Sequence, residues 1–183
     1  MTVDMNDFWV FGYGSLMWNP GFEYEERQAA HLYGFRRALC VRSWVHRGTQ
    51  ERPGLVLGLD YGGSCRGMAF RVAPERWEAV VDYLRERELV THVYLERTLP
   101  ATLGDGRRVT ALAYIIDRAH HQYAGALTIE EAAEAVGSAI GRAGPNIDYV
   151  RNTLLHLREM GIRDHWLEDV GRAAEGLYAR ASA

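Results

Sequence analysis

The predominant spacing of the hydrophobic residues in this sequence changes between residues 117 and 125, and this change constrains the fold more than any other feature. Before it, short runs of β-branched, aromatic and aliphatic residues predict β-strands. After it, apolar residues recur at the spacing of helices. Strands followed by helices indicate the α+β class, with a helical C-terminal part. The expected strands are 9–13, 38–44, 55–61, 65–72, 93–99 and 108–116.

Glycine pairs and capping residues subdivide the two halves of the chain. Gly62-Gly63 and the run 104–106 (Gly-Asp-Gly) predict turns that close hairpins. Thr128 and Glu131 have the spacing of a capping box, which predicts the start of a helix. No repeat, low-complexity run or linker interrupts the chain, so we expect one domain over residues 1–183. The expected helices of the second half are 128–141, 145–160 and one from about residue 164.

Composition excludes several classes of protein. The chain has 183 residues, of which 48% are hydrophobic, and a formal net charge of −3, which argues against a nucleic-acid-binding protein with a basic face. No stretch approaches the ~20 apolar residues of a membrane span, and the first residues lack the pattern of a signal peptide. Cys40 and Cys65 lack the spacing of a zinc or redox pair, which favours buried, reduced thiols. We therefore expect a cytoplasmic protein with no nucleic-acid or membrane partner.

The basic residues exclude several kinds of catalysis. All 21 are arginine, so a Schiff-base lysine, a lysine general base and a P-loop lysine are absent. The Gly12-Tyr-Gly14 stretch lacks a dinucleotide fingerprint, because Met17 stands where the third glycine is needed. The adjacent His120 and His121 cannot share one face of a regular element, and no cysteine or acidic cluster completes a metal site. We expect no metal and no cofactor.

One predicted helix interrupts the strands, and it directs a carboxylate inward. Trp77, Val81 and Leu84 recur at the spacing of a single apolar stripe, which predicts the buried face of a helix. At about 100° per residue, Glu88 falls roughly 20° from this stripe. Glu86 points roughly 180° away from Trp77, toward solvent.

The inward direction of Glu88 has two interpretations. An apolar wall and the nearby helix C-terminus both disfavour the charged carboxylate, which raises its pKa toward the range of a general base. Alternatively, Glu88 forms a structural ion pair with an interior arginine, for which Arg42 and Arg66 on predicted strands are candidates. Periodicity alone leaves both interpretations open.

A series of short motifs in a fixed order gives this sequence a family resemblance. From residue 9 to about residue 170, it closely resembles the ChaC-like γ-glutamylcyclotransferases. The motifs are Trp9-Val-Phe-Gly-Tyr-Gly-Ser-Leu16, Gly34-Phe-Arg-Arg37, His46-Arg-Gly-Thr49, Pro53-Gly54, Tyr83-Leu84 with Arg87-Glu88, and Ala143-Gly-Pro-Asn146 with Tyr149.

The resemblance implies an activity and a fold. The activity is the cleavage of glutathione, a small molecule, to 5-oxoproline and cysteinylglycine without a cofactor. The fold is a small mixed β-barrel flanked by helices. By motif matching, the turn formed by Tyr13, Gly14, Ser15 and Leu16 binds the γ-glutamyl group, and Glu88 is the base.

The implied reaction explains why the turn contains glycine. The α-amine of the substrate attacks its own γ-carbonyl, so the protein supplies a base and donors for the developing oxyanion. Glycines at a strand end let consecutive N–H groups converge on an anion, and Ser15 adds a hydroxyl. The alternative is a purely structural turn whose glycines need positive φ.

Three tyrosines are candidate hydrogen-bond donors to the substrate. Tyr13, Tyr94 and Tyr149 each have the alternative role of a core aromatic with a hydrated hydroxyl. Where the family tends to have glycines before the second of these, this chain has 91–93 (Thr-His-Val), which predicts a different backbone path there.

Three functions are compatible with the sequence. The first is a cyclotransferase specific for glutathione, and the second is one for other γ-glutamyl amines or peptides. The third is a catalytically silent module that binds γ-glutamyl groups, although such a module has no need of Glu88. We expect the segments 17–33 and 117–127, read as loops, to select the substrate side chain.

Overall fold

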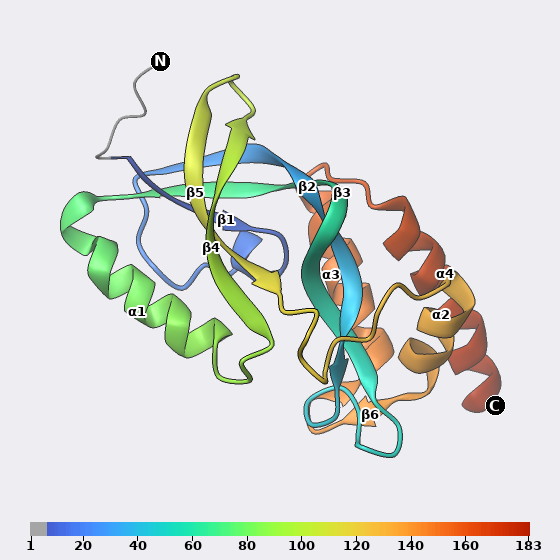
Figure 1. Ribbon diagram of the computed structural model, residues 1–183. Helices are drawn as coiled ribbons and strands as arrows, with labels where there is room; N and C mark the ends of the chain where they lie inside the picture. The colour runs from blue at the N-terminus through green and yellow to red at the C-terminus, as the bar shows by residue number, and fades with distance from the viewer. Residues whose placement is uncertain (1–6) are drawn as a thin grey trace. The chain divides into compact units, whose positions relative to one another are not determined.

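The computed structural model describes residues 7–183 and divides them into two compact units (Figure 1). The first unit contains the residues up to Arg37 and the segment Leu59–Asp117. The second contains Ala38–Gly58 and Arg118–Ala183. Two long strands, β2 (Glu26–Ser43) and β3 (Gly54–Val72), supply residues to both units.

The first unit is built on a closed barrel in the strand order β1-β3-β2-β4-β5. Its other strands are β1 (Phe8–Gly12), β4 (Tyr94–Leu103) and β5 (Arg108–Ile116). β1 is antiparallel to β3 and parallel to β5, so the barrel is mixed and has no open edge between its first and last strands. The α+β class, the mixed barrel and the helical C-terminal part that we expected are confirmed.

One helix, α1 (Trp77–Glu88), packs in the first unit through the apolar stripe seen in the sequence. A 3₁₀ turn, η2 (Pro74–Arg76), precedes it, and proline favours this position because its fixed φ suits a helix start. Leu84 of the helix is fully buried. The buried cluster around α1 comprises Val10, Leu16, Val72, Val80, Val81, Leu84, Leu112 and Tyr114.

The prediction of a turn at Gly62-Gly63 is wrong. β3 is continuous through both glycines, which have φ of +96° and +69°. Glycines with positive φ occur both at bends within long strands and in hairpin turns. A glycine pair alone therefore does not distinguish a bend from a turn. The hairpin predicted at residues 104–106 is confirmed, because Gly106 donates to the carbonyl of Leu103 between β4 and β5.

The strand β2 begins twelve residues before the strand predicted at residues 38–44, since it starts at Glu26. The interpretation of residues 17–33 as a loop is therefore wrong from residue 26 onward. The early part of β2 alternates exposed and buried residues and carries charged side chains, so it lacks the continuous apolar run by which the strand was sought.

The second unit contains α2 (Ile129–Ser138), α3 (Asn146–Glu159) and α4 (His165–Ala181). The predicted capping box is confirmed: Thr128 Oγ1 accepts from the N–H of Glu131, whose carboxylate accepts from the N–H of Thr128. The predicted start of α4 is also confirmed. α2 ends three residues earlier than expected, because β6 (Ile140–Gly141) pairs with β7 (Gly144–Pro145).

Cys40 and Cys65 are both buried, as the sequence predicts, and neither is in a disulfide. Within residues 7–183, no helix has the length and apolar character needed to cross a membrane.

Candidate functional site

The turn that follows β1 is short and tightly packed. After Gly12 the chain passes through Tyr13 and Gly14 into a 3₁₀ helix, η1 (Ser15–Met17), in which the N–H of Met17 donates to the carbonyl of Gly14 at 2.9 Å. The side chain of Leu16 is buried in the α1 cluster, while Ser15 is exposed. The turn therefore presents the residue Ser15, with its hydroxyl, to solvent over an apolar base.

The glycines of this turn do not have positive φ, so the positive φ expected of a structural turn is absent here, while a structural role of the turn is not tested by this angle. Gly14 has φ −133° and ψ −131°, and Gly12 is likewise outside the positive-φ region. A Cβ on Gly12 would lie 3.0 Å from Leu16 Cβ and 3.2 Å from Met17 N. Gly12 is therefore needed for the close approach of η1 to the strand end.

A buried arginine holds the turn against β3. Arg37 is 7% exposed, and its Nε donates to the carbonyl of Tyr13 at 2.6 Å. Its Nη2 donates to the carbonyl of Arg66 at 2.7 Å. The guanidinium thus links the turn to β3, a role that the sequence showed only as membership of a motif.

Glu88 is the last residue of α1, and the helix phase predicted for it is confirmed. Its side chain is 17% exposed, whereas Glu86 is an exposed residue. Burial raises the pKa of the Glu88 carboxyl, and the positive charge of Arg87 opposes this by lowering it. The cation beside Glu88 is this sequence neighbour, with Nε 3.4 Å from Oε1, which the sequence interpretation did not consider.

Arg87 also reaches the turn. Its Nη2 donates to Ser15 Oγ at 2.9 Å. One guanidinium therefore contacts both the inward carboxylate and the hydroxyl of the predicted substrate-binding turn.

Tyr94 begins β4 and packs against the same apolar cluster as Leu16 and Leu84. The structure thus brings together Tyr13, Gly14, Ser15, Leu16, Glu88 and Tyr94 in the first unit.

The departure from the family pattern before Tyr94 has a structural counterpart. His92 has φ +57°, and it is the one non-glycine residue of positive φ in the part of the chain that the structure describes. His92 thus adopts a conformation that glycine adopts more readily.

A tyrosine near Glu88 was missed by the sequence analysis. Tyr114 on β5 is buried, and its hydroxyl donates to Glu96 Oε2 at 3.0 Å. Burial, followed by the nearby carboxylates of Glu96 and Glu88, raises the pKa of Tyr114. Tyr114 lies within an apolar predicted strand, and nothing in the sequence indicated that it would lie near Glu88.

Tyr149 lies on α3, in the second unit. Its hydroxyl accepts a hydrogen bond from the N–H of Leu57 at 3.0 Å, and the guanidinium of Arg47 lies 5.8 Å from its ring centroid. The hydroxyl therefore has a structural bond to β3 in addition to any role with a substrate.

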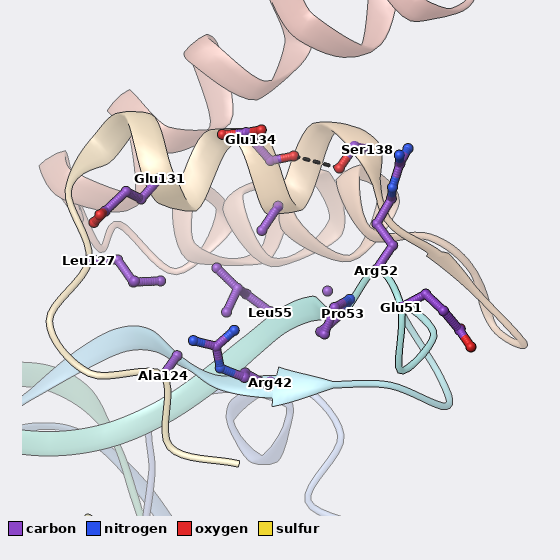
Figure 2. Close-up of a pocket in the computed structure, with 12 residues that line it drawn as sticks. Arg42, Glu51, Arg52, Pro53, Leu55, Ala124, Leu127, Glu131, Glu134 and Ser138 are labelled. Carbon is purple, nitrogen blue, oxygen red and sulfur yellow. Dashed lines mark hydrogen bonds between the residues drawn. The ribbon is translucent and has the colours of Figure 1, made fainter. Parts of the chain in front are cut away.

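A pocket of about 500 Å³ also lies in the second unit. Figure 2 shows Arg42 and Leu55 on one side of it and Glu131 and Glu134 along α2 on the other. None of the residues predicted for the site lines this pocket. Within residues 7–183, no three His, Cys, Asp or Glu side chains gather as a possible metal site.

Comparisons with known proteins agree with the motif series. A family model described as ChaC-like protein matches residues 8–175. The glutathione-specific gamma-glutamylcyclotransferase of Escherichia coli (strain K12) is 36% identical over 167 residues, which cover 91% of this chain and 72% of that protein. Glutathione-specific gamma-glutamylcyclotransferase 1 of Danio rerio is 34% identical over 154 residues, covering 82% and 79%.

A solved structure has the same fold. The crystal structure of a γ-glutamyl cyclotransferase specific to glutathione from yeast superposes with a TM-score of 0.84 at 22% identity, covering 96% of this chain and 98% of that one. At this identity the likeness concerns the fold alone.

Proposed function

This chain belongs to the ChaC-like family, and on that basis we propose that it is a γ-glutamylcyclotransferase, a lyase that converts glutathione to 5-oxoproline and cysteinylglycine. The names of the relatives support the choice of glutathione. The observation that carries the proposal is the position of Glu88, a largely buried carboxylate of raised pKa whose neighbouring arginine contacts the turn after β1.

Glu88 is the proposed general base and acid. It accepts a proton from the α-ammonium group of the substrate, which frees the lone pair of the amine. The amine nitrogen then bonds to the γ-carbonyl carbon, and the bond from that carbon to the cysteinyl nitrogen breaks. Glu88 returns the proton to the departing nitrogen, so one residue serves both steps. The second proton, which the attacking nitrogen must lose to become the lactam N–H, passes through solvent to the amine of cysteinylglycine. Burial favours this role because it raises the proton affinity of the carboxylate.

The turn is the proposed γ-glutamyl site. The first N–H groups of a helical turn have no partner within that turn, and those that open η1 are the proposed donors to the α-carboxylate or to the developing oxyanion. Ser15 adds an exposed hydroxyl, and Tyr13 and Leu16 hold the turn on the core. Tyr94 and Tyr149 are proposed as further substrate ligands.

The test is the release of 5-oxoproline from a panel of γ-glutamyl compounds by the purified protein. We expect release from glutathione and little from γ-glutamyl amines or other γ-glutamyl peptides. Release from those other compounds alone would favour the second function named above. Binding of glutathione without release by a folded protein would favour the silent module.

We also propose that the protein acts in the cytoplasm. The support is that its two cysteines are buried and form no disulfide, which suits a reducing compartment. Fractionation of the cells that make the protein, followed by immunodetection, tests this proposal.

A further inference from the structure

The guanidinium of Arg87 joins three parts of the first unit. Nη2 donates to Ser15 Oγ at 2.9 Å, and Nη1 donates to the carbonyls of Asn19 at 2.7 Å and Pro20 at 3.2 Å. Nε lies 3.4 Å from Glu88 Oε1. All three nitrogens of the guanidinium therefore face partners, and these partners lie on the turn, on the segment after it and at the end of α1.

The Arg87 side chain is also held in place along its length. It is 20% exposed, and Nη1 lies 3.2 Å from the hydroxyl of Tyr83, one turn earlier on α1. A planar guanidinium presents five N–H donors in a fixed fork, so its contacts fix the separation of the groups that it touches. A lysine ammonium would keep the charge but would not span these partners.

We infer that Arg87 is a positioning residue that fixes the Glu88 carboxylate relative to the Ser15 turn. This inference rests on the proposed function, because the pair matters for catalysis only if Glu88 is the base and the turn binds the γ-glutamyl group. The remote contacts to Asn19 and Pro20 anchor the same guanidinium from the other side. Removing the fork therefore loosens the base and the substrate-binding turn together.

The charges around Glu88 make Arg87 its electrostatic partner as well. On the same helix as Glu88, the cation that lowers the pKa of its carboxyl is Arg87. From β5 the facing group is Tyr114, whose hydroxyl is bonded to Glu96 on β4. Glu96 in turn is paired with Arg85, with Nη2 2.9 Å from Oε1. Ser15 faces the site as a neutral hydroxyl, so loss of the Arg87 charge leaves Glu88 among carboxylate, phenol and hydroxyl groups.

The experiment compares Arg87→Met, Arg87→Lys and a control, Arg76→Met, through the pH dependence of kcat and KM for glutathione. Arg76 precedes α1, is exposed and pairs with Glu23. We expect Arg87→Met to move the acid limb of kcat/KM upward by about one pH unit or more, since a cation at this distance lowers a carboxyl pKa by that order. We expect the control to leave the limb in place.

Arg87→Lys separates charge from geometry. We expect it to keep the acid limb near its original pH, because the charge is retained, but to raise KM and lower kcat about tenfold or more, because the fork is lost. Unchanged kcat, KM and acid limb in both Arg87 variants would overturn the inference. A loss of activity in Arg87→Met with no movement of the limb, fully restored by lysine, would also overturn it.

A second readout does not depend on activity. The ¹³C resonance of the Glu88 side-chain carboxyl, assigned by its absence in Glu88→Gln, reports its titration directly. We expect a higher midpoint in Arg87→Met than in the original protein, and an equal midpoint would overturn the inference. If Arg87→Met does not fold, Arg87→Lys decides, because it keeps the charge and removes the fork: a raised KM and lowered kcat support the inference, and unchanged values overturn it. An original protein that releases no 5-oxoproline counts against the proposed function, whereas an unmoved midpoint counts against Arg87.

Discussion

Asn146 in the second unit and Glu88 in the first are both polar side chains from the recognised motifs, and their surroundings differ. Asn146 in the second unit is fully buried, and both ends of its amide are bonded to Leu55: Oδ1 accepts from the N–H at 2.7 Å and Nδ2 donates to the carbonyl at 2.9 Å. Glu88 in the first unit is largely but not fully buried, and the Arg87 cation, with Nε 3.4 Å from Oε1, only partly offsets the effect of burial on its pKa.

This is the difference expected between a structural polar group and the proposed general base. A buried group with all its hydrogen bonds made stabilises the fold and has little reason to change its protonation. A buried carboxylate that is incompletely compensated lowers stability when charged, and it therefore has a raised affinity for a proton. Motif matching alone did not distinguish these two roles, because both residues lie in motifs of the same series.

The largest effect is expected from Glu88→Gln. The amide keeps the size of the side chain but cannot take the ammonium proton, so turnover should fall at least ~10²-fold with the fold preserved. Measurements of 5-oxoproline release and of the thermal midpoint check this. If the variant instead loses about 3 kcal/mol of stability and activity falls only with unfolding, Glu88 is a structural partner of Arg87 and the comparison fails.

Asn146→Ala should act on stability rather than on chemistry. It leaves the N–H and carbonyl of Leu55 buried without their partner, which should lower the free energy of unfolding by about 3 kcal/mol. Asn152→Ala, an exposed position on the same helix, is the matched control and should change it by no more than ~0.5 kcal/mol. Denaturant unfolding of both variants measures the difference in their free energies of unfolding. Equal midpoints would contradict a structural role for Asn146.

The pH dependence of stability offers a smaller and more specific test. A carboxyl whose pKa is raised by folding contributes its stability below the unfolded pKa, and this contribution is lost as the pH rises through the folded pKa. The stability of Glu88→Gln relative to the original protein should therefore increase as the pH rises from about 4 to neutrality. Unfolding curves over this pH range check the sign, and the opposite trend would mean that the charged form of Glu88 is stabilised by the fold.

Glu86→Gln should have the smallest effect. This carboxylate is exposed on the opposite side of α1, so its replacement should change stability by no more than ~0.5 kcal/mol and leave turnover nearly intact. The same two assays used for Glu88→Gln apply. An inactive Glu86→Gln beside an active Glu88→Gln would reverse the assignment of the base.

The sequence predicted features that depend on local geometry. The rotation of a helix per residue is constant, so three apolar positions on α1 were enough to direct Glu88 inward and Glu86 outward. The capping box at Thr128 was found for the same reason, because its two bonds join residues three positions apart.

Features that depend on distant segments were not predictable from the sequence. The bonds of Arg87 to Ser15 and of Arg37 to Tyr13 join segments far apart in the chain, and a single sequence gives no register for such pairs. The reason for Gly12 was missed because its constraint is the approach of η1, which only packing reveals. Gly62-Gly63 was misread because positive φ occurs in both turns and bent strands.

The order of strands in the barrel has a consequence for the synthesis of the chain. β1 has its first partner in β3, about sixty residues later, and its second in β5, about one hundred residues later. At roughly 5–20 residues per second, β1 leaves the ribosome about 5–20 s before the strand that closes the barrel is made. During that time its sequence, Phe-Trp-Val-Phe-Gly, is an apolar strand with unpaired edges, a template on which neighbouring chains can aggregate. Slow closure thus leaves unpaired, for the time of synthesis, the very segment that leads into the proposed substrate-binding turn.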